Sequence, residues 1–555
     1  MKRLLASLLG VQLCAACAHA PPPMPKPPPK VPAERLILPS EKPLVSFRLF
    51  FLAGSMNDPP GKEGLTALTA RLMAEGGTLN LTAAEFQAAL FPLAAELSVE
   101  SGVETTVFVG RVHQDLLDKF VPLLTEAVSH PRFDAAEFER LRRDALDDIQ
   151  VRLRHNDDEG LGKAALQALL YDGHPFGFPS EGTVKGLESI TLGDVISQWK
   201  ALFTRDRLVI GLIGKQATPQ LADRVAAGLA SLPGEGAPLS YLPDATDDGV
   251  KALLVEKTTD STALSLGYTY GVLRSDPDFP ALWVGNSALG EHRQLGGILF
   301  HQLRELRGLN YGDYTYLEHF VQGDDTYPEP NHDRHMQYFS VWLRPVVSEN
   351  RGFALRAALF EIGKVIKDGL SAEQVERTKA FLKTYTLAWQ AADGRRLGYA
   401  IDDLFYGTPD FLSSFRDKLP SITVDQVNAA LRAHIDPGKL RYAIVTQHAR
   451  AFRDELLAGT PSSIKYDSPK PPEVLEADKQ IDVLKLPLDD ADTKLVTSDQ
   501  LFENRALGFR APAATGQAGS NAEPHPQTAP GAGAGARSGS ASPLGAILDA
   551  GAPGR

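Results

Sequence analysis

The stretch GGILFHQLRELRGLNY, residues 296–311, is the part of this chain that decides its fold. Phe300, Leu303 and Leu306 recur at helical spacing, which predicts a short helix with one apolar face. Gly308 follows the last of them and is typical of a helix end. We therefore expect a helix that packs on a core and stops a few residues before the end of the stretch.

Arg304 and Tyr311 are the candidate functional residues of this stretch. A guanidinium and a phenol both donate hydrogen bonds, so they suit a developing oxyanion or the backbone of an extended peptide. Neither group can activate water. The alternative is that Arg304 is only a solvated or salt-bridged helix residue. We interpret the neighbouring Glu305 and Arg307 as surface charges.

A second stretch, GLTALTARLMAEGG at residues 64–77, also predicts a helix. Leu65, Leu68 and Leu72 lie at helical spacing, and the glycine pair at its end stops the helix. Together the two stretches resemble the pitrilysin/insulinase zinc metallopeptidases (inverzincins). In the first stretch the resemblance rests on the paired glycines, the Leu-Arg-Glu core, the Arg-Gly-Leu turn and the Arg-to-Tyr step. It covers about residues 35–460.

The resemblance implies where a zinc site would lie. In the family the first-domain helix has the pattern Gly-Leu-x-His-x-x-Glu-His, in which two His hold zinc and the Glu activates water. The corresponding residues here are Ala67, Ala70 and Arg71. Alanine has no lone pair, and a protonated guanidinium repels a divalent cation, so we predict no metal in this chain. The family's third ligand, a Glu, corresponds to the stretch with Asp147 and Asp148, which we interpret as a solvated helix face.

Histidines elsewhere offer one alternative. His332 and His335 are the only close pair among the 13 His, and Glu329 lies nearby. These three side chains would form a surface metal site. The Pro, Asn and Asp residues around them favour a solvated loop instead, which is the interpretation we prefer.

The first residues indicate export. Lys2 and Arg3 precede an apolar run at 4–13 that is too short to span a bilayer, as in a bacterial signal peptide. The only two cysteines, Cys14 and Cys17, lie at its end and resemble a lipobox.

Two processing sites compete there. Cys17 would be the lipidated residue of a lipoprotein, whereas cleavage after Ala20 would place Pro21 first in the mature chain, and Pro just after a cut is a poor peptidase substrate. We prefer lipidation, with the Pro-rich segment behind Cys17 as a tether. The expectation is a lipoprotein of the bacterial cell envelope that faces the periplasm from the outer membrane.

Composition narrows the classes of function. The net charge of −12 argues against a nucleic-acid partner, and 43% hydrophobic residues suit globular domains. The chain between the Pro-rich tether and the Gly/Ala/Ser/Pro-rich C-terminal tail is too long for one core, which favours two domains. The Gly/Ala/Ser/Pro-rich residues 511–555 are not expected to fold.

Three features occur twice in the same order. Strands at 44–53 and 262–270 each lead through an Asp-Pro pair into a helix, and two N-cap patterns and two Ser-Ile-Thr helix starts follow. This predicts an α+β fold of two homologous domains, each a mostly antiparallel sheet with helices on one face (LuxS/processing-peptidase-like, as the resemblance also implies). The predicted division is a signal peptide 1–17, a tether 18–35, an N-terminal domain 36–235 with the degenerate zinc site, a linker 236–250, a C-terminal domain 251–460 with the Arg/Tyr motif, an extension 461–510 and a tail 511–555.

Three functions remain open. The resemblance implies that a two-domain chain forms half of a peptidase chamber, so a homologous partner subunit that binds zinc would complete it, with Arg304 and Tyr311 acting in trans on unfolded peptides. This interpretation is preferred. The second is a structural or peptide-binding envelope protein that kept the fold without the reaction, as core subunits of respiratory complexes have done. The third is a self-sufficient hydrolase built on Glu329, His332 and His335.

Overall fold

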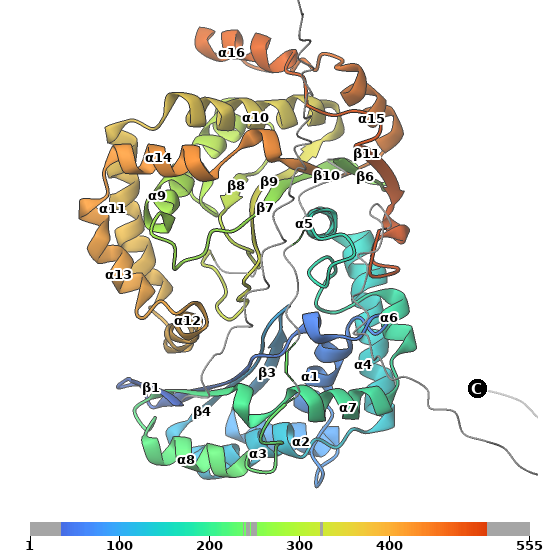
Figure 1. The fold of residues 1–555 in the computed structure, drawn as a ribbon, viewed down its shortest axis with the longest axis vertical. Helices are drawn as coiled ribbons and strands as arrows, with labels where there is room; N and C mark the ends of the chain where they lie inside the picture. Colours follow the sequence, from blue (N-terminus) through green and yellow to red (C-terminus); the bar gives the residue numbers. More distant parts are fainter. Residues whose placement is uncertain (1–34, 237, 240–244, 246–251, 322–325, 508–555) are drawn as a thin grey trace, which may run out of the picture. The chain divides into compact units, whose positions relative to one another are not determined.

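A computed structural model describes residues 35–236, 238–239, 245, 252–321 and 326–507 (Figure 1). The predicted signal peptide with Cys17, nearly all of the tether, most of the linker and the whole tail 511–555 lie outside the described residues. Predictions about those segments stay predictions.

The N-terminal domain is built on a five-stranded sheet. Its strand order is β1-β5-β2-β4-β3, with β1 parallel to β5 and the other pairs antiparallel. Alternate residues of β2, Phe47, Leu49 and Phe51, pack in one cluster with the domain's own helices. The strands are β1 (Arg35–Pro39), β2 (Leu44–Phe51), β3 (Glu96–Ser101), β4 (Thr106–His113) and β5 (Leu208–Gly214).

The C-terminal domain repeats this plan. Its strand order is β11-β6-β10-β7-β9-β8, which is the order of the first sheet with one strand added at an edge. The prediction of two homologous α+β domains is confirmed. The strands are β6 (Ala252–Glu256), β7 (Ser261–Tyr270), β8 (Asp313–Tyr316), β9 (Gln337–Val347), β10 (Arg441–Thr446) and β11 (Thr493–Thr497).

The helices begin where local capping predicts. Thr191, Ser371 and Thr423 each form a capping box with the residue three positions on, and Asp134 caps α4. The helices of the first domain are α1 (Leu65–Glu75), α2 (Ala83–Leu90), α3 (Leu117–Ser129), α4 (Ala135–Asp147), α5 (Asp158–Leu170), α6 (Val184–Ser189), α7 (Leu192–Leu202) and α8 (Pro219–Gly228). Those that follow are α9 (Phe279–Gly290), α10 (Arg351–Asp368), α11 (Ala372–Trp389), α12 (Asp393–Tyr406), α13 (Phe411–Lys418), α14 (Val424–His434), α15 (Ala449–Ala458) and α16 (Pro472–Asp482).

The two domains exchange one helix each. Helix α5 packs on β7 and β10 of the C-terminal sheet, and α12 packs on β2 and β5 of the N-terminal sheet (Figure 1). Leu397 and Ile401 of α12 share a buried cluster with Phe50 and Val209 of that sheet. Each sheet therefore carries its own helices on one face, as predicted, and a helix of the other domain on the opposite face.

The extension after residue 460 joins both domains. Helix α16 packs on α10, and β11 pairs in parallel with β6. Leu501 and Phe502 are buried in a cluster with residues of both domains, and Arg154 donates through Nε to the Leu501 carbonyl at 2.8 Å. Within the described ranges, no helix has the length and apolar character needed to cross a bilayer.

Candidate functional site

A cavity of about 910 Å³ is lined by residues of both domains, and we call it the chamber. Its N-terminal wall includes the exposed side of α1, the end of β3 and part of α5. Its C-terminal wall comes from the loop after β8, the loop before β9 and β9 itself. The wall residues used below are Ala67, Arg71, Val99, Glu100, Glu159, Lys163, His319, His332, Arg334, Tyr338, Trp342 and Arg344.

Helix α1 is held firmly against the chamber. The buried Asp58 accepts hydrogen bonds from the backbone N–H groups of Gly64 and Thr66, each at 2.8 Å, and from Thr66 Oγ1 at 2.6 Å. These bonds satisfy donors at the start of the helix. Ala67 then lines the chamber, while Ala70 is fully buried in the core of the N-terminal domain. Neither residue offers a ligand atom.

Arg71, at a position that the family resemblance assigns to a zinc ligand, belongs to an ion-pair cluster. Its guanidinium lies 3.3 Å from Glu75 and 3.9 Å from Asp144. Arg140 contacts the same two acids, at 3.5 Å and 2.9 Å. A cation already occupies the position between the carboxylates, so these residues do not fit zinc.

No other part of the described chain supplies a metal site: its ranges contain no group of three His, Cys, Asp or Glu placed to hold an ion. Asp147 is exposed and Asp148 pairs with Arg152 at 3.0 Å, which confirms the solvated helix face.

Strand β3 is an open edge beside the chamber. It is the last strand of the N-terminal sheet, among the described residues it pairs with β4 alone, and its residues from Val99 onward line the cavity. An edge strand offers a row of free backbone donors and acceptors to an added strand. The arrangement suits an extended peptide that pairs with β3 and lies in the chamber.

Arg304 and Tyr311 stack on each other next to the chamber. The guanidinium carbon of Arg304 lies 4.4 Å from the Tyr311 ring centroid and 4.7 Å from that of Phe300, in a π-helical turn, Phe300–Glu305. Tyr311 is 67% exposed, so its phenol is free to meet a ligand or a second chain. Neither residue lines the chamber, but Arg344 does and lies 5.4 Å from the same ring.

A clamped turn presents Tyr311. Asn310 Nδ2 donates to Asp313 Oδ1 at 2.6 Å and to the Arg344 carbonyl at 3.1 Å. The Arg344 N–H donates to the Gly312 carbonyl at 3.0 Å. Burial raises the pKa of Asp313 to about 8, while the Asn310 hydrogen bond opposes this shift. The buried carboxyl is therefore largely protonated at neutral pH.

Charged residues that sequence reasoning missed connect this turn to α5. Arg344 pairs with Glu159 at 3.2 Å, Lys163 pairs with Glu159 at 2.7 Å, and the Lys163 ammonium lies 3.8 Å from the Trp342 ring centroid. No motif marks these residues, because their contacts join segments far apart in the chain. They bring the Arg/Tyr pair to the rim of the chamber.

The interpretation of Arg307 as a surface charge is wrong. It is 3% exposed, with Nε 2.8 Å from Asp478 and Nη1 3.7 Å from Glu361. Asp478 belongs to α16, so the extension supplies the carboxylate that makes burial of this guanidinium tolerable. Glu305 is exposed and pairs with His301 at 2.6 Å, as expected of a surface charge.

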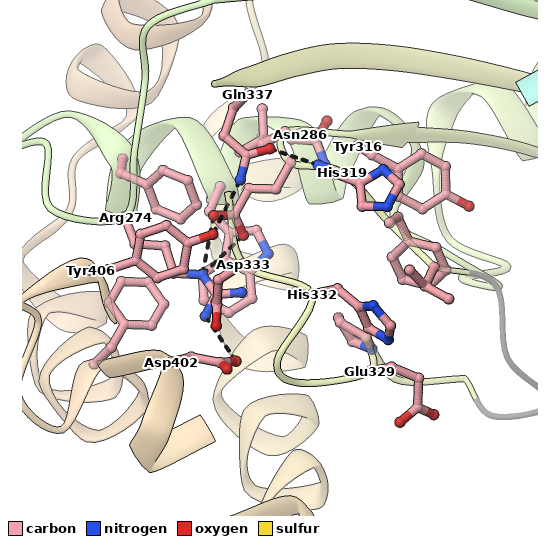
Figure 2. A pocket seen from close by; sticks show the side chains of 18 of the residues that line it. Arg274, Asn286, Tyr316, His319, Glu329, His332, Asp333, Gln337, Asp402 and Tyr406 are labelled. Atoms are coloured by element: carbon pink, nitrogen blue, oxygen red, sulfur yellow. Dashed lines mark hydrogen bonds and ion pairs between the residues drawn. The ribbon is translucent and has the colours of Figure 1, made fainter. Parts of the chain in front are cut away.

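The solvated-loop interpretation of the segment with Glu329, His332 and His335 is also wrong. Asn331 and Asp333 in that segment are 2% and 4% exposed. The three candidate ligands face different partners, listed here: Glu329 pairs with Arg395 at 3.3 Å, His332 lies 3.6 Å from Glu100, and His335 lies 2.7 Å from Glu104. Figure 2 shows Glu329 and His332 beside a buried pocket. Within the described ranges the two residues form no metal-binding group with His335.

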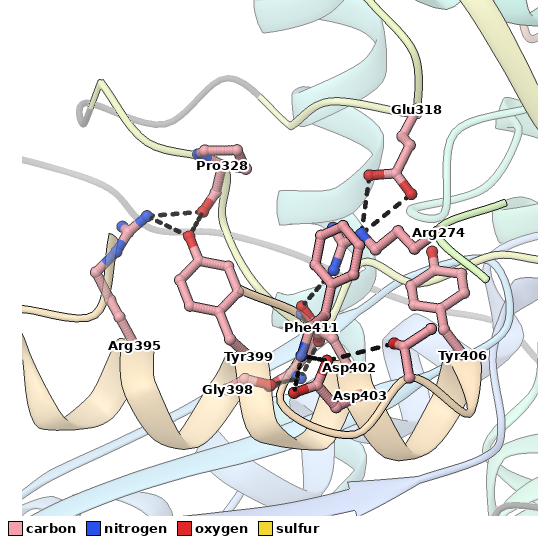
Figure 3. A network of polar contacts seen from close by, with 12 residues as sticks. Arg274, Glu318, Pro328, Arg395, Gly398, Tyr399, Asp402, Asp403, Tyr406 and Phe411 are labelled. Carbon is pink, nitrogen blue, oxygen red and sulfur yellow. Dashed lines mark hydrogen bonds and ion pairs between the residues drawn. The ribbon is translucent and has the colours of Figure 1, made fainter. Parts of the chain in front are cut away.

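A buried polar network holds this segment against α12. Arg274 lies 3.0 Å from Glu318 and 3.6 Å from Asp402 (Figure 3). Asp333 and Asp402 face each other in the same pocket (Figure 2), and burial raises the pKa of both carboxyls. The network fixes one wall of the chamber, because His332 and Arg334 lie on either side of Asp333 in the chain.

Comparison with known proteins places this geometry in context. Residues 36–176 match the family model described as insulinase (peptidase family M16), and residues 189–382 match the model described as peptidase M16 inactive domain. The chain is 22% identical over 407 residues to the non-peptidase homolog YmxG of Helicobacter pylori, covering 73% of this chain and 89% of that protein. It is 25% identical over 366 residues to an uncharacterised zinc protease of Mycobacterium leprae, covering 63% and 76%.

Two solved structures share the fold. One is the peptidase M16 inactive domain from Pseudomonas fluorescens, with a TM-score of 0.67, 24% identity and coverage of 75% of this chain and 96% of that chain. The other is a chain of complex III2 from Candida albicans, with a TM-score of 0.59, 16% identity and coverage of 76% and 96%. At these identities the structures support the fold alone.

Proposed function

Because the chain belongs to the insulinase (M16) peptidase family and lacks its catalytic motif, we propose that it is the non-catalytic half of a heteromeric peptidase. The observation that carries the proposal is Arg71, which forms ion pairs at the position that the resemblance assigns to a zinc ligand, beside the chamber and the open edge of β3. The chain keeps the means to hold a peptide and has lost the means to activate water. A homologous partner with bound zinc would supply the missing step.

In this proposal Arg304 and Tyr311 act on a substrate held by both subunits. Tyr311 is exposed on a turn that Asn310 and Asp313 hold in place, and Arg304 is ordered by its stack on that ring. Positioned donors of this kind stabilise an oxyanion without taking up a proton. The substrate is an unfolded peptide, because only an extended chain can pair with β3.

We place the complex in the bacterial cell envelope. The support is the sequence alone: a signal-like N-terminus, the lipobox-like Cys17 and the Pro-rich segment behind it. Lipidation of Cys17 would anchor the body at the outer membrane, facing the periplasm.

A second candidate function is a peptide-binding or structural envelope protein with no part in proteolysis. It is supported by the likeness to a protein named a non-peptidase homolog. It differs from the first candidate in one respect that can be measured, because it leaves Arg304 and Tyr311 without a catalytic role.

One experiment separates the two. The tagged full chain is purified from native envelopes and its partners are identified by mass spectrometry. We expect a homologous chain with an intact His-x-x-Glu-His helix, and chelator-sensitive hydrolysis of an unfolded peptide by the complex. Arg304→Ala and Tyr311→Phe should each lower kcat by about 10²–10³, as loss of an oxyanion donor does. Arg224→Ala, which removes an exposed ion pair on α8, is the matched control and should leave kcat unchanged.

Full activity of both variants in the complex would support the second candidate instead. Cys17→Ser tests the envelope proposal in the same cells. Loss of the lipid anchor should move the chain from the membrane to the soluble periplasmic fraction, and a variant that stays with the membrane would contradict lipidation.

A further inference from the structure

Arg334 is a buried cation with no anion beside it. The residue is 3% exposed and contributes to the wall of the chamber. Its Nε and Nη1 atoms have no hydrogen-bond partner, and no carboxylate within the described part of the chain forms an ion pair with it. Two other buried arginines have partners: Arg307 forms an ion pair with Asp478, and Arg356 donates through Nε to the Leu484 carbonyl at 2.8 Å.

The side chain is nonetheless held in place. The Arg334 guanidinium carbon lies 5.5 Å from the Phe176 ring centroid and 5.9 Å from that of Tyr338. Its backbone N–H donates to Tyr406 Oη at 3.3 Å, and its carbonyl accepts from Gln337 Nε2 at 3.2 Å. Two aromatic faces thus stabilise the charge weakly while leaving the N–H donors unused.

Neutral histidines surround this corner of the chamber. His319 Nδ1 lies 3.0 Å from Tyr338 Oη, and His332 lines the same wall. Burial, and then the charge of Arg334, lowers the pKa of His332 to about 4 and that of His319 well below its usual value. The nearby acid Glu100 lies 3.6 Å from His332 and does not pair with Arg334. The buried acid Glu104 lies 2.7 Å from His335, so Arg334 remains at this corner without an ion-pair partner of its own among the described residues.

A guanidinium of this kind is costly to keep. Burying a charge without a partner carries a large desolvation penalty, and its unmade hydrogen bonds add to that penalty. The cost is offset if a ligand with the complementary charge and fork geometry occupies the site. Carboxylates are the anionic groups of an unmodified peptide, and the neighbouring edge of β3 suits an extended peptide.

We propose that Arg334 forms a carboxylate subsite in the chamber, which binds either the C-terminal carboxylate or an acidic side chain of the peptide. The proposal rests on the proposed peptide-binding function and adds the class of peptide that the chamber prefers. It requires no zinc and no partner, so it can be tested on this chain alone.

The test measures peptide binding by fluorescence anisotropy. The probes are four forms of one unfolded decapeptide labelled at its N-terminus: with Asp or Asn at a central position, each with a free or an amidated C-terminus. For the full-length wild-type chain we expect at least one carboxylate to tighten binding about tenfold or more. Arg334→Gln should abolish that preference. Arg152→Gln, which removes another guanidinium of the same cavity that is already paired with Asp148, should keep it.

The four probes identify the source of the carboxylate. Loss of tight binding on amidation assigns the C-terminus, and loss on Asp-to-Asn exchange assigns the side chain. Equal binding of all four probes, or an unchanged preference in Arg334→Gln, overturns the carboxylate subsite and leaves the peptide chamber standing. Failure of every probe to bind overturns the proposed peptide-binding function as well.

Thermal melting separates this role from a structural one. Arg334→Met removes the charge but keeps a long side chain, and removal of an unpaired buried charge is often neutral or stabilising. We expect the Tm of this variant to equal or exceed that of the wild type. A Tm lower by more than about 5 °C would show that the fold itself needs the guanidinium, and would overturn the proposal.

Discussion

At the scale of single residues, a charged side chain that forms ion pairs stands where the family resemblance places a zinc ligand. Arg71 supplies one fixed positive charge between Glu75 and Asp144. The loss of the ligands was predictable, because a ligand position on a helix is a local property of sequence. Burial of Arg307 and Arg334 was not, because it depends on partners or rings supplied by distant segments such as α16. From local sequence alone, a charged residue in a polar stretch is predicted to be exposed to solvent. Only the placement of distant segments shows that it is buried.

Asp313 makes the turn that carries Tyr311 sensitive to pH. Its folded pKa of about 8 lies above the ordinary value of 3.8, so the folded state keeps a proton that the unfolded chain releases between these two values. The stabilisation from this group is complete below about pH 4 and is lost as pH rises through about 8. Ionisation then leaves a buried negative charge on a carboxylate whose Oδ2 has no hydrogen-bond partner.

Asp313→Asn should remove this dependence. The amide keeps an acceptor for Asn310 and cannot ionise. We expect the Tm of the wild type, relative to that of the variant, to fall progressively from about pH 4 to about pH 8 and to level off above that. Thermal melts across that range provide the measurement. A constant Tm difference at all pH values would show that Asp313 does not titrate in the folded protein.

At the scale of elements, short-range signals predicted where helices begin but not where they pack. Thr191, Ser371 and Thr423 cap their helices through contacts within three residues. No comparable local sequence signal predicts that α5 and α12 pack on the sheet of the other domain. An apolar helix face can cover either sheet, and only the three-dimensional placement of the two sheets decides between them.

The close packing of α12 can be tested at Gly398. A Cβ atom added at Gly398 would lie 2.5 Å from Pro330 Cγ and 3.2 Å from the Arg48 guanidinium carbon. Gly398→Ala should therefore lower the free energy of unfolding by about 1–3 kcal/mol, as overpacking does. Gly363→Ala in α10, where nothing lies within 4 Å of the added atom, should raise it by up to about 1 kcal/mol. Chemical denaturation measures both, and equal gains in the two variants would mean that α12 is not seated against Pro330.

At the scale of the whole molecule, the two domains and the extension depend on one another. One buried cluster contains Leu65 of the first domain, Val445 of the second and Leu501 of the extension. Residues that a motif search would leave outside the family region therefore complete the core. The domain plan was predictable from the internal repeat, whereas the role of the extension was not, because its apolar residues have no counterpart in the other domain.

Truncation tests whether the extension after residue 460 is needed for the stability of the two domains. A chain that ends after residue 460 loses Asp478 and the Leu484 carbonyl, the partners of the buried Arg307 and Arg356. Breaking the buried Arg307–Asp478 pair costs about 3–5 kcal/mol, against a typical total stability of about 5–15 kcal/mol, and loss of the Leu484 acceptor and of the apolar contacts of the extension adds to this cost. We expect this chain to lose cooperative unfolding, with Asp478→Asn as a milder change that lowers Tm but leaves the protein folded. A chain that ends after residue 510 keeps both contacts and should melt at the wild-type Tm. If the chain ending at residue 460 also melted at that temperature, the extension would have no part in the fold, and the burial of Arg307 would need another explanation.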